Sequence, residues 1–109
     1  MSFKVVILKS AKSDLKDLRD YVIAKFSAQA WSETSRQLQK SLAMLADVPR
    51  IGSVPGEIEM LNLDEYRQVL SGMNRIIYEI RQDVVFIHAI VDVRRDMVSL
   101  LTKRLLRST

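Results

Sequence analysis

The sequence predicts an α+β domain in which an antiparallel helical hairpin covers a small four-stranded sheet. An N-terminal apolar run rich in valine and isoleucine predicts a strand. Apolar residues then recur at steps of three and four up to about residue 46, which is typical of amphipathic helices. Three further apolar runs between residues 66 and 91 are separated by connections of hairpin length. A chain of 109 residues supports one core, so we expect residues 1–109 to form a single domain.

The N-terminal part of the chain is expected to supply one strand and both helices of the hairpin. Phe3–Leu8 predicts the strand, and Ser10 stands where the N-cap of a helix is expected. The periodicity predicts a first helix over Ala11–Phe26 and, after a short break, a second helix to about Ala46, before Pro49. Two helices with so short a connection pack antiparallel. The residues expected to face the sheet are Leu15, Leu18, Val22, Leu38, Leu42 and Leu45.

The C-terminal half predicts a three-stranded antiparallel meander and a short helix. Arg50–Leu63 contains glycine and proline and is the loop-like stretch of the sequence, a candidate for partner contact. Strands are expected over Tyr66–Leu70, Asn74–Arg81 and Val84–Val91, and a helix over Val98–Leu106. The buried side of this helix is expected to carry Val98, Leu101 and Leu105. Because the central strands are apolar on both faces, the hairpin covers one face and another segment partly covers the other.

Composition and charge exclude several classes of function. The chain has no cysteine and one histidine, which excludes disulfides and argues against a metal site. It contains no glycine-rich phosphate loop or nucleotide-binding motif, so no cofactor is expected. No apolar stretch is long enough to span a membrane and no signal-peptide pattern is present, so we expect a cytoplasmic protein without membrane contact. The net charge of +4 favours anionic partners.

The basic residues concentrate at strand ends and at the C-terminus. Arg75 opens one strand, and Arg94 and Arg95 follow the next, so their positions should converge on one rim of an antiparallel pair. The competing interpretation is a local cluster of ion pairs with Asp92 and Asp96. The residues predicted to bind a target are Arg67, Arg75, Arg94, Arg95, Lys103 and Arg104, with Arg107 extending the set.

Three other residues have both a structural and a functional interpretation. His88 lies in the middle of an apolar strand, where a hydrogen-bonded core residue is the structural interpretation and a general acid or base is the functional one. Tyr78 is expected in the core, with its hydroxyl group reaching a partner at the edge. Trp31 is expected to pack within the hairpin, or alternatively to contact a partner.

Two segments carry a resemblance to a known family, namely Asn74-Arg75-Ile76-Ile77-Tyr78-Glu79-Ile80 and Asp92-Val93-Arg94-Arg95-Asp96. Together with the order of elements, they resemble the RelE/ParE superfamily of type II toxin–antitoxin systems, and the resemblance extends over residues 5–106. It implies a compact α+β toxin that a cognate antitoxin neutralises with an acidic or amphipathic segment. It also leaves a homodimer and a heterotetramer with the antitoxin as assemblies to consider.

The superfamily divides into toxins of the ParE kind, which inhibit DNA gyrase, and toxins of the RelE kind, which cleave mRNA on the ribosome. Arg75 and Arg95 match arginines of the ribonuclease pattern, and Arg67 falls near a lysine position. However, Val69 and Leu101 fall where that pattern has a second lysine and a tyrosine. The resemblance therefore implies a gyrase inhibitor. The alternative is a ribosome-dependent endoribonuclease, and a third hypothesis is a basic domain that only binds its partner. The residues that the ribonuclease alternative would use are Arg67, Arg75, His88 and Arg95.

Overall fold

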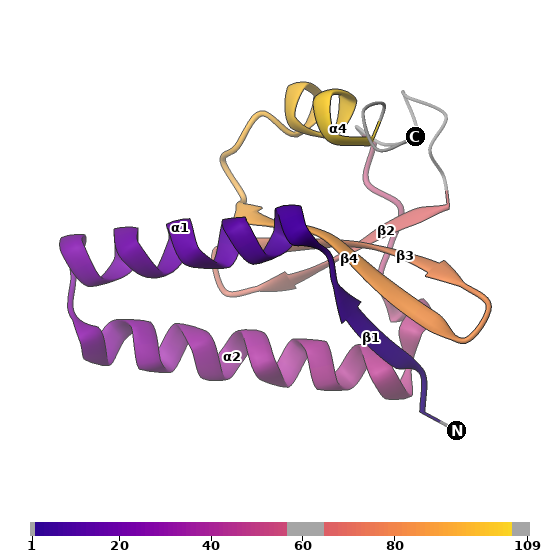
Figure 1. The fold of residues 1–109 in the computed structure, drawn as a ribbon, viewed down its shortest axis with the longest axis horizontal. Coiled ribbons are helices and arrows are strands. Elements are labelled where there is room, and N and C mark those ends of the chain that lie inside the picture. Colours follow the sequence, from indigo (N-terminus) through magenta and orange to yellow (C-terminus); the bar gives the residue numbers. More distant parts are fainter. Residues whose placement is uncertain (1, 57–64, 106–109) are drawn as a thin grey trace.

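The computed structural model describes residues 2–56 and 65–105, in which two layers of helix lie on opposite faces of a four-stranded sheet (Figure 1). The elements in chain order are β1 (Lys4–Ile7), α1 (Lys9–Lys25), α2 (Ala28–Asp47), a 3-10 turn (Pro49–Ile51), β2 (Tyr66–Ser71), β3 (Asn74–Arg81), β4 (Val84–Asp92) and α4 (Met97–Leu105). The predicted α+β architecture and order of elements are confirmed. None of the helices described is long and apolar enough to cross a membrane.

The sheet is mixed, with the strand order β1-β4-β3-β2. β2, β3 and β4 form the predicted antiparallel meander, whereas β1 runs parallel to β4, with Lys4 opposite Val84. The α1–α2 hairpin lies between β1 and the meander in the chain and packs on one face of the sheet (Figure 1). This order leaves β1 and β2 as the two edge strands.

The core between the hairpin and the sheet is built from the predicted apolar positions. Leu38 and Leu45 of α2 are almost completely buried against the strands, and Val22 of α1 is also buried. Leu15, Leu18, Leu42 and Trp31 are partly buried and pack against the same cluster. The buried members of this cluster are Ala11, Leu38, Leu45, Ile76, Tyr78, Val85, Ile87 and Ile90. The predicted burial of the hairpin is thus confirmed.

α4 covers the opposite face of the sheet. Met97, Leu100 and Leu101 are buried, and they pack against residues of β2, β3 and β4. Val98, which we expected on the buried side, is only partly buried. The helix begins one residue earlier than predicted, after Asp96, whose carboxylate accepts hydrogen bonds from the Ser99 N–H at 3.2 Å and its hydroxyl at 2.9 Å. The Leu105 side chain, Leu106 and Arg107 lie outside the described residues.

The predicted N-cap of the first helix is wrong, and the helix begins two residues before the expected start. α1 begins at Lys9, and Ser10 is not its N-cap, because the Ser10 hydroxyl donates instead to the His88 carbonyl oxygen at 3.0 Å. Ser27, by contrast, caps α2, and its hydroxyl accepts from the Ala30 N–H at 3.0 Å. A tertiary contact thus replaces the local cap that the sequence suggested for α1.

The expected loop over residues 50–63 is more ordered at its start than predicted. Residues Pro49–Ile51 form the 3-10 turn, and Ser53 pairs with Gln68 at the edge of β2. Tyr78 is fully buried, and its hydroxyl donates to the Pro49 carbonyl at 2.7 Å and accepts from the Gly52 N–H at 3.0 Å. The prediction of a core tyrosine with a hydroxyl partner is therefore confirmed. Residues 57–63 of the expected loop lie outside the described residues.

Candidate target-binding surface

A β-bulge in β4 decides which side chains share a face of the sheet. Ile77 pairs with Ala89 but Tyr78 pairs with Ile87, so His88 is an extra residue in β4. Ala89 belongs to the cluster under α4, and the His88 ring contacts Tyr66 of the same cluster. Two consecutive residues of β4 therefore face α4, which strict alternation along a strand would not allow.

Arg75 lies at the expected end of the sheet, opposite Val91 of β4. It is 7% exposed, and its Nε atom donates to the Gln68 Oε1 atom at 2.7 Å. Since Ile76 faces the hairpin core and Ile77 faces α4, Arg75 lies on the α4 face of the sheet. Its guanidinium group is thus held against the sheet by a β2 side chain.

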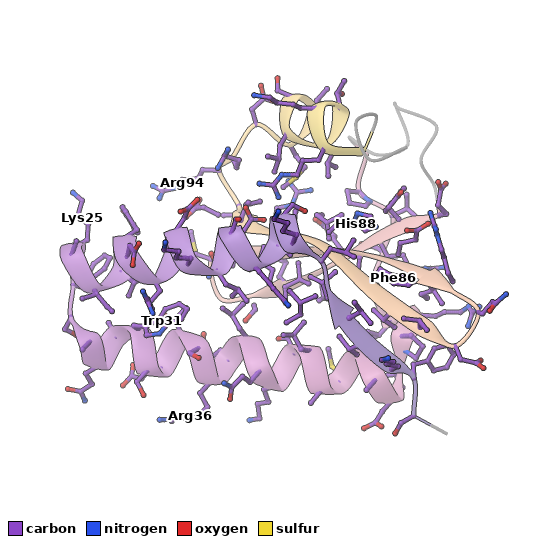
Figure 2. All side chains as sticks on the ribbon, in the orientation of Figure 1. Lys25, Trp31, Arg36, Phe86, His88 and Arg94 are labelled. Atoms are coloured by element: carbon purple, nitrogen blue, oxygen red, sulfur yellow. The ribbon has the colours of Figure 1, made fainter. Side chains whose placement is uncertain are left out.

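Arg94 and Arg95 lie in the loop between β4 and α4. Figure 2 shows Arg94 above α1. The Asp92 carboxylate accepts from the Arg94 backbone N–H at 2.8 Å and from its Nε at 2.9 Å. These hydrogen bonds lower the pKa of Asp92 and raise the pKa of Arg94. Arg95 is exposed, and its backbone N–H donates to the Asp92 carbonyl oxygen. Its guanidinium group has no hydrogen-bond or ion-pair partner among the described residues.

A groove of about 420 Å³ lies between α1 and the end of β4. Arg94, Arg95 and Asp92 line one side, and residues of α1, including Asp17 and Tyr21, line the other. Arg75 is not among its lining residues. The structure therefore brings together two of the three arginines expected at one rim, and it places the third on the α4 face.

Arg104 was expected to be an exposed side chain that binds the target, but the structure shows it in an internal ion pair. Its two terminal nitrogens each donate to one oxygen of the Asp14 carboxylate at 2.6 Å. Asp14 is 7% exposed and also accepts from the Ile90 N–H at 2.9 Å, so one carboxylate joins α1, β4 and α4. This hydrogen-bonded pairing raises the pKa of Arg104. Neighbouring Lys103 is exposed, as a target-binding residue would be.

Arg67 lies on the hairpin face of the sheet, because it pairs with Tyr78, whose side chain is in the hairpin core. Its terminal nitrogen donates to the Gly52 carbonyl oxygen at 2.7 Å. Arg67 and Arg75 therefore lie on opposite faces of the sheet. The expected continuous surface from Arg67 to Arg95 is not formed by these side chains.

His88 is part of a polar network under α4. Its Nε2 atom lies 3.0 Å from the Glu79 Oε1 atom, and the Arg81 Nε atom donates to Glu79 Oε2 at 2.7 Å. The Tyr66 ring packs edge-to-face on the His88 ring, with centroids 5.0 Å apart. Burial raises the pKa of the Tyr66 hydroxyl, and the nearby Glu79 carboxylate adds to the shift. Sequence reasoning did not single out Tyr66, Glu79 and Arg81 as one group with His88, because the bulge that aligns them leaves no sequence signal.

The four residues that the ribonuclease alternative would use lie in three different places. His88 and Arg75 lie on the α4 face, Arg67 on the hairpin face, and Arg95 in the exposed loop. A general base and a cation at one scissile bond must lie within hydrogen-bond reach of the same atoms. Among the described residues there is no group of three metal-ligating side chains. What gathers instead is a cationic loop beside an amphipathic groove.

Sequence comparison gives one family match. The model of the ParE toxin of the type II toxin–antitoxin system parDE matches residues 5–97. No significant match is found among curated protein sequences.

Solved structures of toxins share this fold. A chain of the chromosomal ParDE toxin–antitoxin system from P. aeruginosa superposes with a TM-score of 0.69 at 13% identity, covering 84% of this chain and 96% of that one. A mutant of E. coli toxin RelE in the free state gives 0.66 at 17% identity and covers both chains completely. A chain of the RelBE2 toxin–antitoxin complex from Mycobacterium tuberculosis gives 0.56 at 19% identity, covering 84% and 99%.

Proposed function

Because this chain belongs to the ParE toxin family of type II toxin–antitoxin systems, we propose that it inhibits DNA gyrase and that a cognate antitoxin neutralises it. The proposal places the protein in the cytoplasm, where its target acts. Its main support in the structure is that Arg67 and Arg95, two of the four residues that a ribonuclease would need, lie away from the α4 face that carries His88 and Arg75. An inhibitor that acts by binding requires only a surface, whereas RNA cleavage requires a base and a cation around one phosphate.

The proposed contact with the target is the loop of residues 93–96 together with the groove beside α1. Arg95 is the exposed cation of this loop whose side chain has no ion pair among the described residues. Arg94 is held by Asp92, so its charge is partly compensated before any partner arrives. We therefore expect Arg95 to contribute more to target binding than Arg94, and exposed Lys103 to add to the positive field.

The antitoxin is proposed as a stable partner. The P. aeruginosa relative is part of a ParDE system, and the M. tuberculosis relative is a toxin–antitoxin complex. A net charge of +4 favours an acidic partner. Light scattering of the co-expressed pair would distinguish a heterotetramer from a simple heterodimer, and the same measurement on the toxin alone would detect a homodimer.

The decisive experiment measures gyrase supercoiling and in-vitro translation with the same purified protein. We expect wild-type protein at micromolar concentration to inhibit supercoiling and to leave ribosome-bound message intact. Adding the cognate antitoxin should restore supercoiling. Cleavage of ribosome-bound message without an effect on gyrase would instead establish the ribonuclease alternative. Activity in neither assay, with antitoxin binding retained, would favour the domain that only binds its partner.

Arg95→Ala tests whether the loop is the contact, and Lys12→Ala on the exposed side of α1 is the matched control, since both remove one exposed positive charge. Loss of a charged contact should weaken inhibition by about 1–2 kcal/mol, or about fivefold to thirtyfold, for Arg95→Ala alone. A uniform small loss for both variants would indicate long-range attraction without a specific contact.

A further inference from the structure

A second groove, distant in sequence from the loop of residues 93–96, lies between α2 and the edge strand β2. It has a volume of about 290 Å³. Its lining includes Gln37, Lys40 and Met44 of α2, and Leu70, Ser71 and Gly72 of β2 and its turn. We refer to it as the β2–α2 groove. It combines apolar surface, one cation and several uncharged polar groups.

Ser71 has a polar atom that the fold leaves unused. The residue is 5% exposed, and its hydroxyl has no hydrogen-bond partner among the described residues. A buried hydroxyl without a partner is unfavourable, and most such groups in folded proteins are paired. The Gln37 Oε1 atom lies next to Gly72, and the Gln37 side chain is exposed, so this flexible group can move away from the turn. The orphaned hydroxyl indicates a ligand that supplies the missing partner.

The backbone of β2 offers hydrogen bonds at the same place. The Gln68 N–H and C=O point away from β3, because they bond to Ser53 at 2.8 and 3.2 Å. In an antiparallel strand the outward-pointing residues alternate, so the N–H and C=O of Leu70 point outward as well. Ser53 is the isolated bridge partner of Gln68 on the outer side of β2. Leu70 pairs with Arg75 of β3, and no described residue pairs with Leu70 on the side of β2 away from β3. The end of the edge strand near the groove can therefore accept another strand.

Exposed apolar side chains surround this free backbone. Leu70 is 61% exposed and Met73 is 62% exposed, and Met44 lies at the exposed limit on the α2 side. Methionine adapts its shape to a partner at low cost and is common at binding surfaces. An edge strand that carries such residues is normally protected or covered.

We propose that the β2–α2 groove binds an extended segment of the cognate antitoxin, which adds a strand beside Leu70 and places an acidic side chain next to Lys40. The inference rests on the proposed function, since it requires an antitoxin. Lys40 is exposed, has no ion pair among the described residues, and selects for a negative partner. A second copy of this chain fits less well, because it would bring another positive groove. A lone inorganic anion would use Lys40 and Ser71 but not the apolar side chains.

Hydrogen exchange on the toxin, followed residue by residue by NMR with and without antitoxin, tests the proposal directly. The Leu70 amide should exchange rapidly in the free toxin and become protected in the complex by tenfold or more. The Gln68 amide is an internal control, because Ser53 already protects it in the free toxin. An unchanged exchange rate of the Leu70 amide in the antitoxin-saturated complex, with Gln68 protected in both states, would overturn the proposal.

Two substitutions test the side chains without disturbing the fold. Ser71→Ala removes a hydroxyl that has no partner in the free toxin, so the melting temperature should stay the same or rise while antitoxin affinity falls about threefold to tenfold. Lys40→Glu should weaken binding by about tenfold or more, and Lys12→Glu on exposed α1 should not. Wild-type affinity in both groove variants would refute the proposal.

The possible results of these experiments distinguish a failure of the groove proposal from a failure of the proposed toxin function. If antitoxin binds but leaves Leu70, Ser71 and Lys40 unaffected, the groove is the wrong site and the toxin function stands. If wild-type toxin forms no complex with the antitoxin, both the partner and the groove proposal are refuted. If millimolar inorganic phosphate shifts the Ser71 and Lys40 resonances and antitoxin does not, the groove is an anion site.

Discussion

Replacing Arg104 with alanine separates two roles that one arginine in a toxin can have. The sequence favours contact with the target, whereas the structure gives Arg104 a bidentate pair with buried Asp14. If the pair holds α4 against α1, then Arg104→Ala should destabilise the fold, and any loss of toxicity should follow from lost stability. If Arg104 instead binds the target, stability should be retained and only inhibition should fall.

The size of the effect follows from burial. Removing one partner of a buried hydrogen-bonded ion pair costs about 3–5 kcal/mol, because the remaining charge has no counterpart. The Arg104 side chain is 23% exposed and Asp14 retains the Ile90 N–H, so we expect about 2–4 kcal/mol for Arg104→Ala. With a urea m-value of about 1.5 kcal/mol/M for a chain of this size, the midpoint should fall by about 1.3–2.7 M.

Urea unfolding followed by circular dichroism measures this shift, and a double-mutant cycle with Asp14→Ala isolates the pair. The double variant should cost less than the sum of the single variants by about 1–3 kcal/mol. Lys103→Ala is the control, since this neighbour is exposed and should change stability by less than about 0.5 kcal/mol. A coupling energy near zero, with Arg104→Ala as stable as wild type, would refute the structural role.

Three further outcomes are expected. Tyr78→Phe leaves the Gly52 N–H and a carbonyl oxygen without their buried partner, so stability should fall by about 1–3 kcal/mol; an unchanged melting temperature would contradict this. Hydrogen bonds from Ser99 lower the pKa of Asp96. This carboxylate therefore stabilises the fold above its ordinary pKa of about 4, and the contribution is lost as the pH falls through the lowered pKa. Asp96→Asn should flatten the pH dependence of unfolding below about pH 4, and identical profiles for the two proteins would exclude this role. Arg95→Ala should leave the melting temperature unchanged and weaken gyrase inhibition, and a loss of both would point to a structural role.

The sequence by itself determined the elements and their order. The helical periodicity predicted the ends of both hairpin helices to within a few residues, because apolar residues such as Leu38 and Leu45 recur along the sequence at helical spacing. Hairpin-length connections predicted the meander. Tyr78 could be assigned to the core because it shares a face of its strand with Ile76 and Ile80, and a buried tyrosine then needs a partner for its hydroxyl group. These features depend on the spacing of residues that are close in the sequence, so they can be predicted from the sequence alone.

Tertiary structure alone decided how the charged residues are used. Asp14 and Arg104 are 90 residues apart in sequence, and only the docking of α4 on the sheet makes them a pair. The bulge at His88 turns that residue toward Glu79, which strict alternation would not predict. Long side chains reach whichever partner the packing of distant elements places nearby. A charge pattern in the sequence therefore gives the position of a cation along the chain but leaves its partner to the fold.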